Sequence, residues 1–354
     1  MSAAQQAAGR TTEQPVLQVE DLTVAFPTED GVVRAVRGMT YSVAPREVLG
    51  IVGESGSGKS VSSMAVMGLL PRSAQITGRI MFRGEDVLTM SARQQRGLRG
   101  RRVSMIFQDP MTAMNPVYTV GDQLAEAVRS HSAGAAEGRP QEGQGDARPR
   151  RHPSGRGAAA GVPARVLRRH EAARDDRHGD HQRPDVIIAD EPTTALDVTV
   201  QAQVLDTLMS VKDAVGAAIV FITHDLGVIA QVADRVLVMY AGKPVEIGTT
   251  REVFSKPLMP YTVGLLGSTP SAEGSRAGER LRPIKGSPPS LISLPRGCPF
   301  GPRCPLVRED CRASEPELRH RGAPASGGWS SGGTHRPGAA RGQPRPPRGV
   351  PPQR

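Results

Sequence analysis

The chain has 354 residues, a formal net charge of +10 and three cysteines. This length allows one large domain or two smaller ones. Cysteines confined to residues 298–311 exclude the disulfide framework of a small secreted protein. No run approaches the roughly 18 apolar residues of a membrane-spanning helix, and the polar N-terminus lacks an apolar signal core, so we expect the chain in the cytosol.

The positive charge is concentrated in two segments. Residues 131–183 hold 11 Arg against 7 acidic residues, and residues 319–354 hold 7 Arg and no acidic residue. Outside these segments the chain is close to neutral, so its basicity does not mark a folded surface for nucleic acid. We therefore expect no nucleic-acid partner.

The N-terminal part predicts a small antiparallel sheet. Residues 1–14 are polar and are expected to be disordered. Apolar and β-branched residues then predict one strand over 16–20, a break, a second strand over 22–26, and further strand over 32–43 with Gly38 in its turn.

A glycine-rich loop follows, and it fits the pattern G-x-x-x-x-G-K-[ST]. The loop consists of Gly53, Glu54, Ser55, Gly56, Ser57, Gly58, Lys59 and Ser60. An apolar strand precedes it at 47–52, and helical spacing follows it at 61–70, whereas a chance match would lack this context. Such a loop turns backbone N–H groups toward phosphates, Lys59 supplies a charge to them, and Ser60 can hold Mg²⁺.

Three later strands end in polar residues. The strand at 103–107 is followed by Gln108, the one at 186–189 by Asp190 and Glu191, and the one at 218–223 by His224. Carboxyl ends of parallel strands are where open α/β sheets bind ligands. Taken alone, Gln108 is more often a turn residue and His224 could equally be a strand-end residue in a turn, while a surface acidic pair is the alternative for Asp190 and Glu191.

Three longer stretches identify a resemblance. They are Phe107-Gln108-Asp109-Pro110-Met111-Thr112-Ala113-Met114-Asn115-Pro116, Pro260-Tyr261-Thr262-Val263-Gly264-Leu265-Leu266 and Gly297-Cys298-Pro299-Phe300-Gly301-Pro302-Arg303-Cys304-Pro305. With the glycine loop they resemble the ATP-binding subunits of ABC transporters, in the branch that imports oligopeptides, dipeptides and nickel. The resemblance implies an α/β fold: a P-loop NTPase core with a mostly parallel sheet, an N-terminal antiparallel β subdomain and a short cysteine-containing C-terminal extension.

The resemblance assigns roles at an ATP and Mg²⁺ site. Asp190, Ser60 and Gln108 would lie around the Mg²⁺, and Glu191 would polarise the attacking water. Gln108 would also lie at the γ-phosphate and report its presence to the membrane partner, and His224 would contact the same phosphate.

Two further roles follow from the same resemblance. Phe26 would stack on the adenine ring, although a core aromatic at a strand end is an equal alternative. Ala195, Leu196 and Asp197 would face a second ATP-binding subunit, either a copy of this chain or a different one.

The resemblance implies a transport complex on the cytoplasmic face of the cell membrane. Its members would be two permease subunits, the second ATP-binding subunit and, indirectly, an extracytoplasmic solute-binding protein. Two alternatives stay open: a soluble ABC-type ATPase acting on DNA or ribosomes, and a product that binds nucleotide but is catalytically inactive.

One part of the family pattern is missing. Between Gln108 and Asp190 the family carries a helix that opens with a Ser-Gly-Gly signature, and this chain has none. With permitted codons, residues 162–173 read one nucleotide later give Tyr-Pro-His-Glu-Phe-Ser-Gly-Gly-Met-Arg-Gln. We therefore hypothesise that residues 131–183 were translated out of frame; a genuine linker or a diverged helical subdomain is the alternative.

This hypothesis divides the chain into six parts. A segment so poor in apolar residues cannot offset its ordering cost, so we expect 131–183 to be disordered or poorly packed, and the helical subdomain to be degraded. The parts are a disordered start (1–14), the first part of the ATPase core (15–130), the aberrant segment (131–183), the second part of the core (184–255), the C-terminal extension (256–318) and a disordered basic tail (319–354).

The three cysteines lie in the extension. Cys298, Cys304 and Cys311 are spaced so that loops can turn their sulfurs toward one metal centre, but closed sites usually need four. The resemblance implies a [4Fe–4S] cluster with a fourth cysteine further on, which this chain lacks. The alternative is three thiols without a metal.

Overall fold

The structure is a computed structural model that describes residues 14–108, 115–131, 183–194, 196–268 and 283–318. The predictions for the N-terminal start, for almost all of the aberrant segment and for the basic tail lie outside the described residues. So does part of the stretch that begins at Phe107.

A six-stranded sheet forms the centre of the molecule, in the order β10-β9-β3-β8-β7-β6. Its strands are β3 (Val48–Val52), β6 (Val103–Ile106), β7 (Val186–Asp190), β8 (Ala218–Ile222), β9 (Arg235–Tyr240) and β10 (Lys243–Thr249). All neighbours are parallel except β9 and β10. Every residue of β3, β7 and β8 is buried, which explains their unbroken apolar runs. The mostly parallel core is thus confirmed.

The predicted antiparallel sheet is also present, in the order β2-β1-β4-β5. Its strands are β1 (Leu17–Thr28), β2 (Gly31–Val43), β4 (Gln75–Phe82) and β5 (Glu85–Asp86). Two details of the prediction were wrong. The break near Asp21 is an irregularity within one continuous strand, with Asp21 at a φ of 48°. Gly38 is unpaired between Arg37 and Met39 at a shift of register, so it makes a bulge and no turn.

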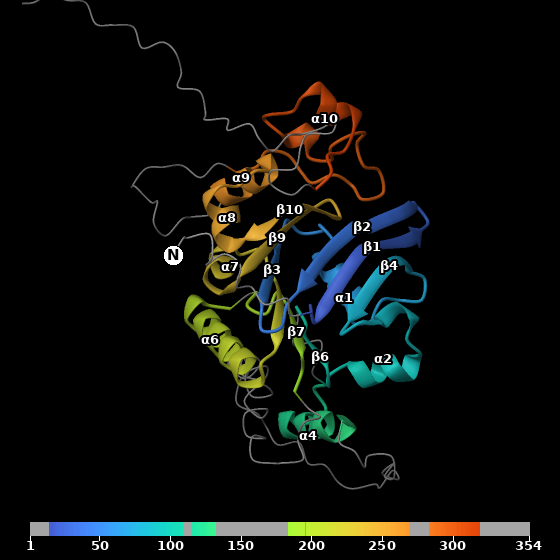
Figure 1. Ribbon diagram of the computed structural model, residues 1–354, viewed down its shortest axis with the longest axis vertical. Coiled ribbons are helices and arrows are strands. Elements are labelled where there is room, and N and C mark those ends of the chain that lie inside the picture. Colours follow the sequence, from blue (N-terminus) through green and yellow to red (C-terminus); the bar gives the residue numbers. More distant parts are fainter. Residues whose placement is uncertain (1–13, 109–114, 132–182, 195, 269–282, 319–354) are drawn as a thin grey trace, which may run out of the picture.

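The described helices are mostly short. They are α1 (Lys59–Val66), α2 (Ala92–Leu98), α4 (Val120–His131), α6 (Val198–Val215), α7 (Leu226–Val232), α8 (Thr250–Ser255), α9 (Pro260–Gly267) and α10 (Glu309–Ala313), with 3₁₀ turns η1 (Val87–Thr89) and η4 (Gly301–Arg303). Figure 1 shows α6, α7 and α8 on one side of the parallel sheet and the antiparallel sheet on the other, with α4 and α10 at opposite ends. No helix of the described ranges is long and apolar enough to cross a bilayer.

Two hydrophobic cores cover the two faces of the parallel sheet. Alternate residues of each strand enter different cores, as Ile188 and Ile187 of β7 do. The first core lies between this sheet, α1 and the antiparallel sheet, and the second between this sheet, α6, α7 and the C-terminal extension. With both faces covered, only the strand ends are left to present polar groups.

Candidate functional site

The carboxyl ends of four neighbouring strands bring the predicted polar residues together. The glycine loop leaves β3, Gln108 lies just beyond β6, Asp190 ends β7, and His224 follows β8. Because these strands are parallel neighbours, their ends share one edge of the sheet.

Glycines shape the loop at its two ends. Gly58 caps α1 at a φ of 96°, and a Cβ there would lie 2.2 Å from the carbonyl oxygen of Ala35. A Cβ at Gly53 would lie 2.3 Å from the carbonyl oxygen of Met239. Both positions therefore exclude any other residue without movement of neighbouring backbone.

Lys59 lies inside the loop and is almost fully buried. Its Nζ donates to the carbonyl oxygens of Gly53 (2.8 Å) and Glu54 (3.0 Å). Burial lowers the pKa of Lys59, while the nearby acidic residues oppose this shift. The hydroxyl of Ser57 is also buried, without a hydrogen-bond partner in the described structure. A buried cation and an unpaired hydroxyl in a glycine loop are groups that a phosphate would satisfy.

Ser60 and Asp190 meet beside the loop. Ser60 Oγ donates to Asp190 Oδ1 at 3.0 Å, although the two residues are 130 positions apart. Asp190 is 2% exposed, and this burial raises the pKa of its carboxyl group. A hydroxyl and a carboxylate that converge at a phosphate loop are ligands that suit Mg²⁺.

Glu191 is the centre of a second polar group. Its side chain accepts hydrogen bonds from Gln108 Nε2 (3.2 Å) and Thr194 Oγ1 (2.8 Å), and His224 Nδ1 lies 3.4 Å from the other carboxylate oxygen. Its backbone has a φ of 47°, held by the bond from its N–H to the carbonyl of Ile222. Such backbone strain is concentrated at functional sites. Thr194 was missed because nothing in its sequence position distinguishes it.

The remaining predicted contact residues are Phe26 and residues 195–197. Phe26 lies in β1, half-buried against the first core. Asp197 caps α6 by accepting from the N–H of Val200, and Leu196 precedes it. Ala195 lies outside the described residues. The roles of Phe26 and of residues 195–197 stay predictions.

The three cysteines line one small cavity in the extension. The cavity has a volume of about 10 Å³, and its other lining residues are mostly apolar, including Met259, Pro260 and Phe300. This is room for about one water molecule. Within the described ranges, no three His, Cys, Asp or Glu side chains are arranged to hold a metal ion. The arrangement therefore does not fit a four-iron cluster, and burial raises the pKa of the Cys298 and Cys304 thiols.

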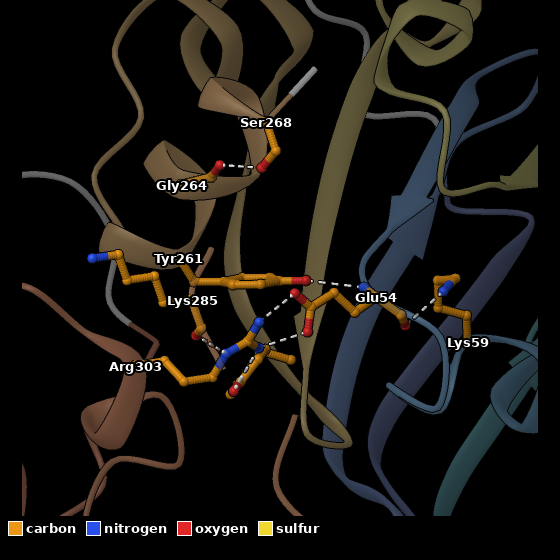
Figure 2. Close-up of polar contacts among 8 residues, drawn as sticks. Glu54, Lys59, Tyr261, Gly264, Ser268, Lys285 and Arg303 are labelled. Carbon is orange, nitrogen blue, oxygen red and sulfur yellow. Dashed lines mark hydrogen bonds and ion pairs between the residues drawn. The ribbon is translucent and has the colours of Figure 1, made fainter. Parts of the chain in front are cut away.

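Two residues of the extension reach the glycine loop, and sequence reasoning did not assign them a role. Arg303 forms an ion pair with the side chain of Glu54, and the hydroxyl of Tyr261 accepts a hydrogen bond from the backbone N–H of Glu54. Figure 2 shows both contacts. Both residues lie in stretches that carried the family resemblance, which was the one available signal.

Comparison with known families gives two matches along the chain. The ABC transporter family matches residues 36–166. A family described as the oligopeptide/dipeptide transporter C-terminal region matches residues 245–311, which includes Tyr261, Arg303 and the three cysteines. The first match ends before Asp190.

Curated relatives agree with these matches. The dipeptide transport ATP-binding protein DppD of Bacillus subtilis is 46% identical over 304 residues, which are 82% of this chain and 87% of that protein. The oligopeptide transport ATP-binding protein OppD of Salmonella typhimurium is 42% identical over 309 residues, covering 85% and 89%. OppD of Mycobacterium tuberculosis is 48% identical over 316 residues, covering 86% of this chain but only 50% of that longer protein.

Proposed function

The chain belongs to the ATP-binding proteins of oligopeptide and dipeptide ABC transporters, and we propose that it binds Mg-ATP at residues 53–60 and hydrolyses it to drive peptide import. One observation carries this proposal: a buried lysine, a serine–aspartate pair and a positioned glutamate converge at one edge of the sheet. The peptide cargo rests on the names of the relatives.

The phosphate side of the site is built from Lys59 and the loop. Lys59 would hold the β- and γ-phosphates with its ammonium, aided by backbone N–H groups of the loop and the N-terminus of α1. Ser60 and Asp190 would hold Mg²⁺, which supplies charge neutralisation on the phosphate oxygens. The buried hydroxyl of Ser57 adds a donor that has no protein partner in the described structure.

The hydrolytic side is built around Glu191. Its carboxylate would accept a proton from the attacking water, while Gln108 and Thr194 hold the carboxylate in place. His224 is largely exposed next to the carboxylate of Glu191, and its side chain can turn toward the γ-phosphate. Because Gln108 bonds directly to Glu191, a movement of the segment after β6 would reach the catalytic group.

Partners are inferred from the family and from exposed apolar residues near Gln108 in the sequence. Phe107, Val117 and Tyr118 are exposed apolar residues close to Gln108 in the sequence, with Val117 82% exposed. Such residues favour a permease contact in this region. Leu196 and Asp197 would face a second ATP-binding subunit. We place the protein on the cytoplasmic face of the membrane, with two permeases and, indirectly, a solute-binding protein.

A second candidate function is a nucleotide-binding product with impaired turnover. It is favoured by the missing Ser-Gly-Gly signature and by a family match that ends at residue 166, inside the aberrant segment. ABC sites form between two subunits, one giving the phosphate loop and the other the signature. A complex with this chain would then hydrolyse ATP poorly at the partner subunit's loop.

Hydrolysis in the assembled complex tests the proposal. Glu191→Gln should lower the rate at this chain's loop about 10²- to 10⁴-fold while Mg-ATP still binds, because it removes the base and keeps the shape. Isothermal titration of the full chain measures binding separately. A chain that does not bind Mg-ATP contradicts the proposal, and full-rate hydrolysis at both loops contradicts the second candidate. Sequencing the gene over residues 131–183 decides the reading frame.

A further inference from the structure

Two side chains of the C-terminal extension (residues 256–318) bind Glu54, the second residue of the glycine loop. Arg303 Nη1 lies 2.7 Å from Glu54 Oε2, and Arg303 Nη2 lies 2.9 Å from Glu54 Oε1, a two-pronged pair. The N–H of Glu54 donates to the hydroxyl of Tyr261 at 2.9 Å. Figure 2 shows the guanidinium and the phenol approaching this residue from two elements of the extension.

The guanidinium is fixed from every side. Its side chain is 7% exposed. Nε donates to the carbonyl of Lys285 at 3.0 Å, and Nη1 also donates to the hydroxyl of Tyr240 at 3.2 Å. The rings of Tyr240, Tyr261 and Phe300 pack with centroids 4.5–5.4 Å apart beside it. A planar, buried guanidinium that is bonded in this way is held in place, so it cannot move along with Glu54 if Glu54 shifts.

Glu54 connects these contacts with the extension to Lys59, the phosphate-binding lysine. Its carbonyl oxygen accepts from Lys59 Nζ, while its N–H and carboxylate are the groups held by the extension. The path from Arg303 to Lys59 therefore crosses one residue. Arg303 also directly precedes Cys304, so the same short segment carries the guanidinium and a cavity-lining thiol.

We propose that Arg303 and Tyr261 are positioning residues for the phosphate loop, and that they couple nucleotide occupancy to closure of the cysteine segment of the extension. The nucleotide half of this inference rests on the proposed function. Coupling between two sites is reciprocal: if the closed extension favours Mg-ATP binding, bound Mg-ATP holds the extension closed by the same factor.

The chain offers a matched control for the Arg303–Glu54 pair. Arg37 in β2 forms a two-pronged pair with Glu315, at 3.1 and 2.7 Å. This pair also joins the extension to the core, and Lys243 lies 3.6 Å from the same carboxylate. Neither partner of Glu315 belongs to residues 53–60. Glu315→Gln thus removes a similar ion pair from the same extension without touching the loop.

The first measurement is Mg-ATP affinity of the full chain, by isothermal titration. Arg303→Gln and Glu54→Gln should each weaken binding about 5- to 150-fold, the usual range for coupled sites. Their double variant should lose little more than either single one. Arg303→Lys keeps the charge without the fork and should recover only part of the loss. Glu315→Gln should bind as the wild type does.

The second measurement is the alkylation rate of each cysteine by N-ethylmaleimide, read by mass spectrometry. Cys298 and Cys311 are buried, so their rates report opening of the extension. Without nucleotide, Glu54→Gln should speed alkylation, although the change lies in the loop. Mg-ATP should slow alkylation in the wild type and not in Arg303→Gln, whereas a merely structural Arg303 would leave the nucleotide effect unchanged.

The outcomes separate this inference from the proposed function. Wild-type affinity in Arg303→Gln and Glu54→Gln overturns the inference while leaving ATP binding in place. A wild-type chain that binds no Mg-ATP overturns the proposed function, and the nucleotide-free alkylation rates of Glu54→Gln still decide whether loop and extension are coupled. Unchanged rates there overturn the inference. If Arg303→Gln does not fold, Glu54→Gln carries the test from the loop side.

Discussion

The glycine loop and the C-terminal extension are held in place by opposite means. The loop is closed by contacts between near neighbours, such as Lys59 with Gly53, and by the strand and helix on either side. The extension has only short helical pieces after residue 283, and long-range contacts hold it, as between Arg303 and Glu54, which are 249 positions apart. The bonds of Lys59 within the loop are therefore local in sequence, while the contacts that join the loop to the extension come from far along the chain.

This difference teaches where each region is vulnerable. A substitution of a loop residue disturbs the loop directly, and its main effect is on nucleotide binding. A region built from distant contacts fails as a unit, because each contact depends on the others being in place. Glu54 takes part in both kinds of contact, since it bonds to Lys59 within the loop and to Tyr261 in the extension.

Lys59→Ala should break the loop from within and gives the largest expected effect. The substitution removes a charged donor at the phosphates, which contributes about 1.5–3 kcal/mol to Mg-ATP binding. The alkylation rates of the cysteines without nucleotide should change less than in Glu54→Gln, because Lys59 does not contact the extension directly. Isothermal titration measures the affinity, and equal values for both chains would remove Lys59 from the site.

Gly297→Ala should break the extension from within. Gly297 has a φ of 73°, and a Cβ there would lie 2.3 Å from the carbonyl oxygen of Cys311. We expect a cost of about 1–3 kcal/mol, because the left-handed backbone and the contact both resist a side chain. Faster alkylation of Cys298 and Cys311 would report the opening, with a smaller loss of Mg-ATP affinity than in Lys59→Ala. Gly267→Ala, where a Cβ meets nothing within 4 Å, is the control.

The same contrast explains what the sequence could predict. The loop, the buried strands and the acidic pair at the end of β7 were predicted because their patterns are continuous in the chain. The bulges at Asp21 and Gly38 were misread as a break and a turn, because either leaves a gap in the alternation of a strand.

Long-range pairings could not be predicted in this way. Arg303 and Tyr261 lie in recognised stretches, but their target in the loop is set by how the chain folds back, which one sequence does not reveal. The gathering of Gln108 and His224 around Glu191 was predicted only to the extent that strand ends share an edge, and Thr194 was not predicted at all. The sequence left open whether the three cysteines hold a cluster or are thiols without a metal, and it did not reveal that all three line one small cavity.

Asp190→Asn gives the smallest expected effect. It sharpens the comparison because it separates the stability of the nucleotide-free chain from Mg-ATP binding at the loop. Burial raises the pKa of Asp190 above its ordinary value, more than the bond from Ser60 lowers it. A raised pKa in an acid means that its contribution to stability is present below the unfolded pKa and is lost as the pH rises through the folded pKa. The buried carboxylate of Asp190 therefore works against folding of the nucleotide-free chain once the pH exceeds its raised pKa.

The asparagine can still accept from Ser60 and carries no charge. We expect the nucleotide-free variant to be about 0.5–2 kcal/mol more stable at pH 7, with a flatter loss of stability as the pH rises from acid to neutral. Mg-ATP should bind it more weakly, since a ligand of Mg²⁺ is lost. Thermal and denaturant unfolding from pH 4 to pH 8 measures the difference. A nucleotide-free variant less stable than the wild type at pH 7 would mean that Asp190 holds the loop closed without nucleotide, as the extension does from the other side.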